Sequence, residues 1–143
     1  QHPKNEMIEI GAKKIKLGVD KSHKLYGWDN EYGVYEESVE SFKASKYLVS
    51  NGEFIEFVKD KGYEREEFWD EEGIKFLELT KIKKPTFWVL ESDVYKYRTL
   101  SKIIDMPYDW PVDVNALEAE AFCRYKSKKE KLTYQLPSEV EYR

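Results

Sequence analysis

Alternating apolar and polar residues dominate the first fifty positions of the chain. Met7–Ile10 and Lys14–Val19 alternate on either side of a Gly-Ala step, which predicts an opening hairpin or strand pair. Glu37–Tyr47 alternates again and predicts a strand with a partly exposed face. Between them, Asp20–Tyr35 is rich in Gly, Asp, Asn and aromatic residues, and we expect a loop there.

The pattern then changes to the period of an amphipathic helix. Ser50 and Glu53 have the spacing of a capping box, which predicts a helix start. We expect this helix to end with Gly62 in the C′ position. Its apolar face would consist of Phe54, Ile55, Phe57 and Val58.

A helical turn at Glu64–Trp69 and a further helix at Asp70–Thr80 follow. Pro85 comes just after the second of these and marks its end. The residues expected to point inward from this helix are Ile74, Phe76, Leu77 and Leu79.

The last third of the chain predicts two short strands and one long helix. Thr86–Leu90 and Tyr95–Thr99 flank a polar turn, and Ile103–Trp110 is expected to be irregular. Asn115 offers an N-cap for a helix over Ala116–Lys131. The residues expected on its buried side are Leu117, Ala121, Phe122 and Tyr125. Strands, helices, short strands and a helix in this order predict an α+β fold.

A second capping-box spacing, Ser138 with Glu141, begins five residues before the last position. A single helical turn is marginal alone, because its nucleation orders several residues for one hydrogen bond. The expectation from this tail is that residues 1–143 belong to a longer protein.

The amino-acid composition argues against several classes of function. Charged residues make up 36% of the chain but the net charge is only −4, so nucleic acid is not an expected partner. The lysine cluster at Lys126, Lys128, Lys129 and Lys131 is interrupted by Glu130 and favours a solvated helix end. No apolar run is long enough to span a membrane, and we expect no signal sequence, because no basic stretch followed by an apolar one occurs at the start of residues 1–143.

Cys123 is the single cysteine, so an intrachain disulfide is impossible. This favours a reducing, cytoplasmic compartment. Cys123 neighbours apolar helix positions and is expected to be a buried structural thiol.

Metal-ligand spacing is absent, because His2 and His23 form no recognisable motif. The candidate contact residues are Trp28, Asp29, Asn30 and Glu31, in the loop Gly27–Gly33. One interpretation is structural: the aromatic residues fill the core and the polar ones cap backbone groups. The other is a substrate or partner contact. A Ca²⁺ site would need more oxygen ligands than this loop offers.

Several segments together carry a family resemblance. They are Lys14–Gly18, Tyr26–Gly33, Phe42–Phe54, Gly62–Tyr63, Phe68–Trp69, Gly73, Pro85–Val89, Met106–Asn115, Glu118–Ala119, Ala121–Cys123 and Leu136–Glu139. In them the chain resembles the formylglycine-generating-enzyme-type (sulfatase-modifying-factor) domain of ergothioneine and ovothiol sulfoxide synthases. The Tyr26–Gly33 and Met106–Asn115 segments are most similar to the ovothiol-type enzymes, the 5-histidylcysteine sulfoxide synthases.

The resemblance implies a C-type-lectin-like fold, of which residues 1–143 would be the N-terminal portion, incomplete at its C-terminus. It also implies a parent enzyme that uses non-haem Fe(II) and O₂ to join the sulfur of cysteine to histidine and oxidise it to a sulfoxide. In this family the iron lies on histidines of a separate helical bundle, and a methyltransferase domain follows in ovothiol-type enzymes. Both would lie outside this chain.

No catalytic residue is carried over from the family, and no metal ligand is expected in this chain. Cys123 stands alone, whereas formylglycine-generating enzymes bind copper with paired cysteines. We expect the isolated chain to be inactive, a scaffold with part of a substrate cleft.

Two other functions stay open: a non-catalytic lectin-like binding module, and a formylglycine-generating-type oxidase of protein cysteine. An upstream helical segment with metal-spaced histidines would favour the synthase, and paired cysteines downstream would favour the oxidase. Neither, together with a natural end near Arg143, would favour the binding module. Uncovered strand edges would also let the chain dimerise or swap elements.

Overall fold

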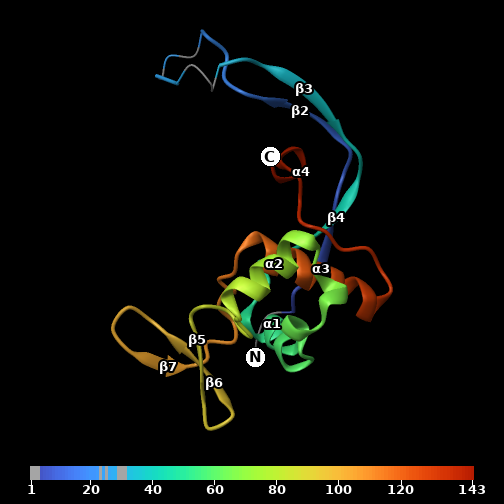
Figure 1. The fold of residues 1–143 in the computed structure, drawn as a ribbon. Helices are drawn as coiled ribbons and strands as arrows, with labels where there is room; N and C mark the ends of the chain where they lie inside the picture. Colours follow the sequence, from blue (N-terminus) through green and yellow to red (C-terminus); the bar gives the residue numbers. More distant parts are fainter. Residues whose placement is uncertain (1–3, 23, 25, 29–31) are drawn as a thin grey trace. The chain divides into compact units, whose positions relative to one another are not determined.

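The computed structural model describes residues 4–22, 24, 26–28 and 32–143. It combines helices with short antiparallel strands (Figure 1). The chain divides into two compact units, one formed mainly by Tyr47–Leu136 and the other by Asn5–Lys46 with Pro137–Arg143.

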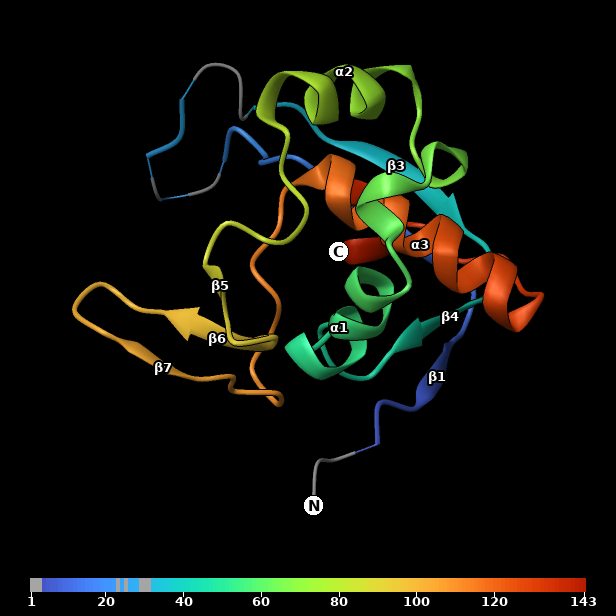
Figure 2. The same cartoon turned by 60° about the horizontal axis from the view of Figure 1, so that its bottom comes forward.

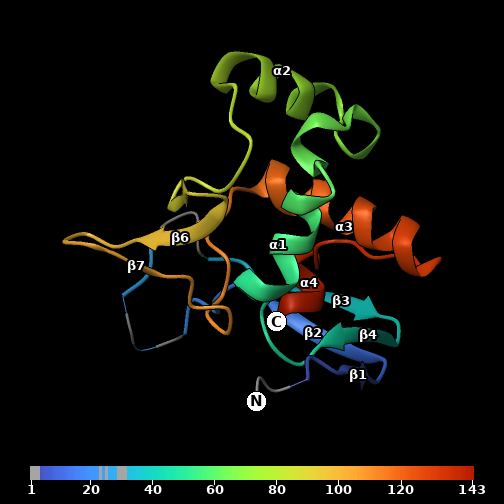
Figure 3. The same ribbon diagram turned by 90° about the horizontal axis from the view of Figure 1, so that it is seen from below.

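The smaller unit is built on two antiparallel strand pairs. β1 (Met7–Ile10) pairs with β4 (Phe42–Ser45), and β2 (Lys13–Leu17) pairs with β3 (Tyr35–Val39), as Figure 3 shows. The prediction of strands at both opening positions is confirmed, but the prediction that they pair with each other is wrong. The chain runs on from β1 into β2 and reverses only after residue 17, so both strands take their partners from residues 35–45.

The strand expected over Glu37–Tyr47 is therefore two strands, separated at residues 40–41. Only Leu17 and Val39 are buried in these strand pairs. The short helix α4 (Glu139–Tyr142) contacts β3 and starts with the predicted capping box. In that box the backbone N–H of Ser138 donates to the Glu141 carboxylate over 2.8 Å.

In the larger unit, helix α1 (Asn51–Lys59) begins with the predicted capping box: the Glu53 backbone N–H donates to Ser50 Oγ over 3.2 Å. The prediction of Gly62 in the C′ position is wrong, because Lys61 follows the C-cap Asp60 and adopts the left-handed conformation with φ 58°. Gly62 instead lies against the buried ring of Phe57, where an added Cβ would be 2.0 Å from a ring carbon. A glycine is required here by close packing.

Two 3₁₀ turns, η1 (Gly62–Glu64) and η2 (Glu66–Phe68), lead to α2 (Glu71–Thr80). Asp70 caps α2 by accepting the Gly73 backbone N–H over 2.7 Å. Three of the four residues predicted to face inward, Ile74, Phe76 and Leu77, pack against the core. The prediction for Leu79 is wrong, since it lies on the outer face of the helix and is 85% exposed.

Helix α3 (Ala116–Glu130) is the longest described element and packs beside α1 (Figure 2). Ala121, Phe122 and Tyr125 are buried on it as predicted, and Leu117 is partly buried. The Phe54 ring of α1 stacks on Phe122 with 5.1 Å between ring centroids. No helix among the described residues combines the length and apolar character that a membrane crossing needs.

The unit also contains a three-stranded sheet of β5 (Trp88–Glu91), β6 (Val94–Arg98) and β7 (Ile103–Asp105). Ser92 and Asp93 both have positive φ, as tight hairpin turns require, so the predicted turn is confirmed. β7 was not predicted, because Pro107 and Pro111 suggested that residues 103–110 are irregular. The three residues of β7 end before the first of them, Pro107.

Candidate functional site

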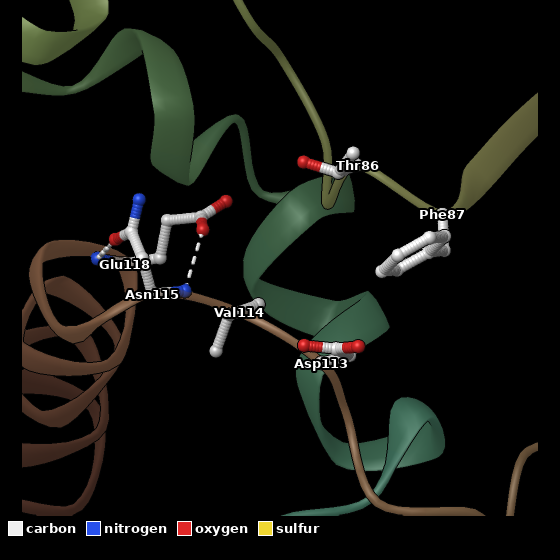
Figure 4. Close-up of a pocket in the computed structure, with 6 residues that line it drawn as sticks. All are labelled: Thr86, Phe87, Asp113, Val114, Asn115 and Glu118. Atoms are coloured by element: carbon white, nitrogen blue, oxygen red, sulfur yellow. Dashed lines mark hydrogen bonds between the residues drawn. The ribbon is translucent and has the colours of Figure 1, made fainter.

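A shallow pocket lies between the start of β5 and the start of α3 (Figure 4). Its volume is about 270 Å³, and it is lined by Thr86, Phe87, Asp113, Val114, Asn115 and Glu118. Thr86 and Phe87 come from the segment that follows Pro85, and the other four come from the segment that enters α3. Two stretches about thirty residues apart in the sequence therefore form its walls.

Asn51, the first residue of α1, holds these two stretches together. It is fully buried, and its Oδ1 accepts the Trp88 indole N–H over 3.2 Å. Its Nδ2 donates to the Pro107 carbonyl over 3.0 Å. One amide side chain thus connects β5 to the Pro107 segment. Both the oxygen and the nitrogen of this buried side chain form a hydrogen bond, as buried polar atoms generally do.

Backbone hydrogen bonds add to this attachment. The Asn51 N–H donates to the Trp110 carbonyl over 2.8 Å, and the Gly52 N–H donates to the Tyr108 carbonyl over 2.9 Å. The Val112 N–H donates to the Val49 carbonyl over 2.9 Å. The chain just before Asp113 is consequently fixed against the start of α1.

Glu118 lines the pocket and is only 3% exposed. One carboxylate oxygen accepts the Tyr63 hydroxyl over 2.5 Å, and the other accepts the Asn115 backbone N–H over 2.9 Å. The Asn115 side chain accepts the Glu118 N–H in return, which completes the capping box of α3. Burial, and then the negative charge of Glu118, raise the pKa of the Tyr63 hydroxyl.

Asp113 is the second carboxylate at the pocket, and it is exposed. Phe87, which is 37% exposed, supplies an aromatic wall. This wall continues as a row of rings, with 6.3 Å between the Phe87 and Tyr97 centroids and 5.9 Å between those of Tyr97 and Trp110. The pocket therefore offers negative charge next to apolar surface.

Of the residues predicted from the sequence to make contacts, Trp28 is the one described, and it does not line this pocket. Asp29, Asn30 and Glu31 lie outside the described residues. Trp28 is 67% exposed and meets Tyr26, itself 81% exposed, edge to face at 5.6 Å. The interpretation in which these aromatic residues fill the core is therefore wrong for both of them.

No three His, Cys, Asp or Glu side chains gather in a metal-binding group within the described ranges. His2 and His23 lie outside those ranges. The donors described here thus do not form the facial ligand set that non-haem iron requires, and we assign no iron ligand to them. Cys123 is half-buried on α3, and burial raises the pKa of its thiol. That environment is inert rather than reactive.

Two lysines near the end of α3, Lys128 and Lys129, form ion pairs with glutamates. Lys128 Nζ lies 2.6 Å from a carboxylate oxygen of Glu67, and Lys129 Nζ lies 2.6 Å from one of Glu56. Both lysines are well exposed, which confirms the prediction of a solvated helix end.

The sequence did not single out Thr86, Phe87 or Asp113 as site residues. All three did fall within the segments that carry the family resemblance. The prolines at positions 85 and 111 precede both walls, but proline alone does not distinguish a pocket from an ordinary turn.

Comparison with known proteins gives two findings. Residues 1–143 match the family described as the sulfatase-modifying factor enzyme 1-like domain. Hercynine oxygenase of Mycobacterium tuberculosis is 31% identical over 127 residues, which cover 88% of this chain and 28% of that protein.

Hercynine oxygenases of Mycolicibacterium thermoresistibile and Mycolicibacterium smegmatis are each 28% identical over 127 residues. The matches cover 88% of this chain and 26% and 28% of those proteins, respectively. The chain thus spans less than a third of the length of these relatives.

Proposed function

The chain belongs to the sulfatase-modifying factor enzyme 1-like family, and from this premise we propose that it is part of an oxygenase that acts on histidine or a histidine derivative. The observation that carries the proposal is the 31% identity to a hercynine oxygenase over 88% of the chain. The parent protein would couple the sulfur of cysteine to the histidine ring with O₂ and form a sulfoxide.

Within this class, the finer assignment is to the ovothiol type, in which the acceptor is histidine itself. Its support is the resemblance of Tyr26–Gly33 and Met106–Asn115 to the ovothiol-type synthases. Hercynine as the acceptor is the alternative, because it is named by the relatives.

The role proposed for this chain is a scaffold and part of a substrate cleft. Asn51 fixes β5 and the Pro107 segment together, so the walls of the pocket hold their spacing before any ligand arrives. In the family, bound iron supplies the activation of O₂. No described residue here is given a part in that step.

The fold proposed for the complete domain is C-type-lectin-like, with residues 1–143 as its N-terminal portion. The iron-binding bundle and, for an ovothiol-type enzyme, a methyltransferase would lie outside these residues. This arrangement agrees with the share of the relatives that the chain covers.

The test uses the purified parent protein with Fe(II), cysteine, and either histidine or hercynine, in air and under anaerobic conditions. The expected result is an O₂- and Fe(II)-dependent sulfoxide product, identified by mass spectrometry, that forms faster with histidine. Preference for hercynine would overturn the ovothiol assignment. No product with either acceptor would overturn the proposal of an oxygenase.

The 143-residue chain is the matched control, and we expect it to give no product under the same conditions. Robust coupling by the chain alone would contradict the role of scaffold.

A further inference from the structure

The pocket in Figure 4 is lined by two carboxylates and, among its described lining residues, by no Lys, Arg or His. The carboxylate of Asp113 makes no hydrogen bond or ion pair with the described residues. The guanidinium of Arg98, which is not part of the lining, donates to the Thr86 carbonyl, with 3.5 Å between nitrogen and oxygen. The lining therefore has an excess of negative charge.

The negative charge of Glu118 is partly compensated by its position at the start of a helix. It stands at the third residue of α3, where the positive end of the helix dipole and two hydrogen bonds stabilise a carboxylate. Asp113 lies before the helix and has no such compensation among the described residues. Asp113 is thus the group most available to a ligand.

The nature of the ligand follows from the remaining lining. A metal ion is disfavoured because the described donors do not gather into a group of three. Phe87 and Val114 present apolar surface, which a hydrated inorganic cation does not use but an alkyl group does. The Phe87 ring also attracts a cationic head group through its π electrons.

We propose that the pocket between Thr86–Phe87 and Asp113–Glu118 binds a small organic ammonium ion, with the ammonium group on Asp113 and the alkyl part against Phe87 and Val114. The two carboxylates would repel a ligand that carries its own carboxylate close to the ammonium group. A simple alkylamine should therefore bind better than a free α-amino acid. This site goes beyond the proposed reaction, and its test measures binding alone.

The probe is n-butylammonium, compared with 1-butanol as the neutral analogue and butyrate as the anion. Each is titrated into the ¹⁵N-labelled 143-residue chain at neutral pH and followed by amide chemical shifts. The expected result is a saturable shift at Phe87, Val114 and Asn115 with the ammonium ion, and none with butyrate. Equal effects of 1-butanol would overturn the role of charge.

Two variants locate the site. Asp113→Asn should weaken the binding of butylammonium about 5-fold, which is the upper end of the effect of an exposed ion pair. Asp109→Asn, an exposed aspartate of the same unit outside the lining, is the matched control and should leave the affinity unchanged. Because Asp113 is exposed, its substitution should leave the folded spectrum intact.

Identical affinity in Asp113→Asn and the unsubstituted chain would overturn the assignment. Chemical-shift changes at acidic residues over the whole surface, without changes at the pocket residues, would also overturn it, because they would indicate nonspecific electrostatic attraction.

Discussion

Asn51 and Trp88 are 37 residues apart in the sequence and are joined by a buried hydrogen bond of 3.2 Å from the indole N–H to the side-chain oxygen. Both side chains are essentially inaccessible to solvent. The other half of the Asn51 amide bonds the Pro107 carbonyl. This pair therefore connects the first helix, the three-stranded sheet and the segment that leads to the pocket.

Asn51→Ala should lower the free energy of unfolding by about 3 kcal/mol, because an indole N–H and a carbonyl lose their partner in a buried place. Urea unfolding followed by tryptophan fluorescence measures this change. Thr80→Ala removes a hydroxyl that bonds the Phe76 carbonyl at an exposed position and should cost less than about 0.5 kcal/mol. Equal costs for both variants would refute the proposed role of Asn51.

Gly62→Ala should destabilise the chain by about 2 kcal/mol, since its methyl group would overlap the buried Phe57 ring. Gly11→Ala is the control, because nothing lies within 4 Å of its added Cβ. We expect that control to be neutral or slightly stabilising. Thermal unfolding of the two variants makes the comparison, and a harmless Gly62→Ala would show that the Phe57 ring is free to move aside.

Tyr63→Phe should cost about 2 kcal/mol at neutral pH, because one oxygen of the buried Glu118 carboxylate loses its donor. Burial raises the pKa of Tyr63 above its ordinary 10.0, so the unfolded chain ionises this tyrosine first. The stability that comes from the neutral phenol is complete below pH 10.0 and is lost as the pH rises further.

The difference between Tyr63→Phe and the unsubstituted chain should accordingly shrink above pH 10.0. Urea unfolding at several alkaline pH values measures it. A difference that grows with pH would contradict the assigned direction.

Asp70→Asn tests a pKa shift in the opposite direction, for which stability is lost in acid and not in alkali. The Gly73 N–H, and then the charge of Arg124, hold the pKa of Asp70 below its ordinary 3.8. The resulting stability is present above pH 3.8 and is lost as the pH falls through the lower, folded-state pKa. Asparagine keeps the helix cap but does not titrate.

The melting temperature of the unsubstituted chain should therefore exceed that of Asp70→Asn at neutral pH and approach it in acid. A constant gap across this range would exclude titration of Asp70 as its cause.

Self-association should depend on β1. It pairs only with β4 among the described strands, and its Met7 and Ile8 are 40% and 42% exposed. Such an edge promotes pairing between copies. Light scattering should show concentration-dependent dimers that Ile8→Lys reduces, whereas the exposed-helix control Leu79→Lys should not. A monomer at every concentration would refute this expectation.

The helices were predictable because their start signals are local. Ser50, Asn115 and Ser138 each form a capping box with a glutamate three residues later, and each box is present in the structure. The strand pairing was not predictable in this way. Alternation in Met7–Ile10 shows that a strand forms, but which strand becomes its neighbour depends on where the chain reverses direction.

The same distinction between local and long-range information applies to the candidate site. Sequence segments that include Met106–Asn115 were enough to indicate the family, and the match over residues 1–143 confirms it. The pocket required the tertiary structure, because its two walls are distant in the sequence. They are brought together by contacts such as those of Asn51, whose two side-chain hydrogen bonds reach residues 37 and 56 positions away.

The sequence by itself determined the helix starts, most strand positions and the family, since these follow from local spacing of residue types. Only the tertiary structure decided which strands pair, why position 62 is glycine, and which carboxylates share a pocket. The reason is physical: contacts between distant residues depend on how the whole chain packs, and local patterns do not encode that packing.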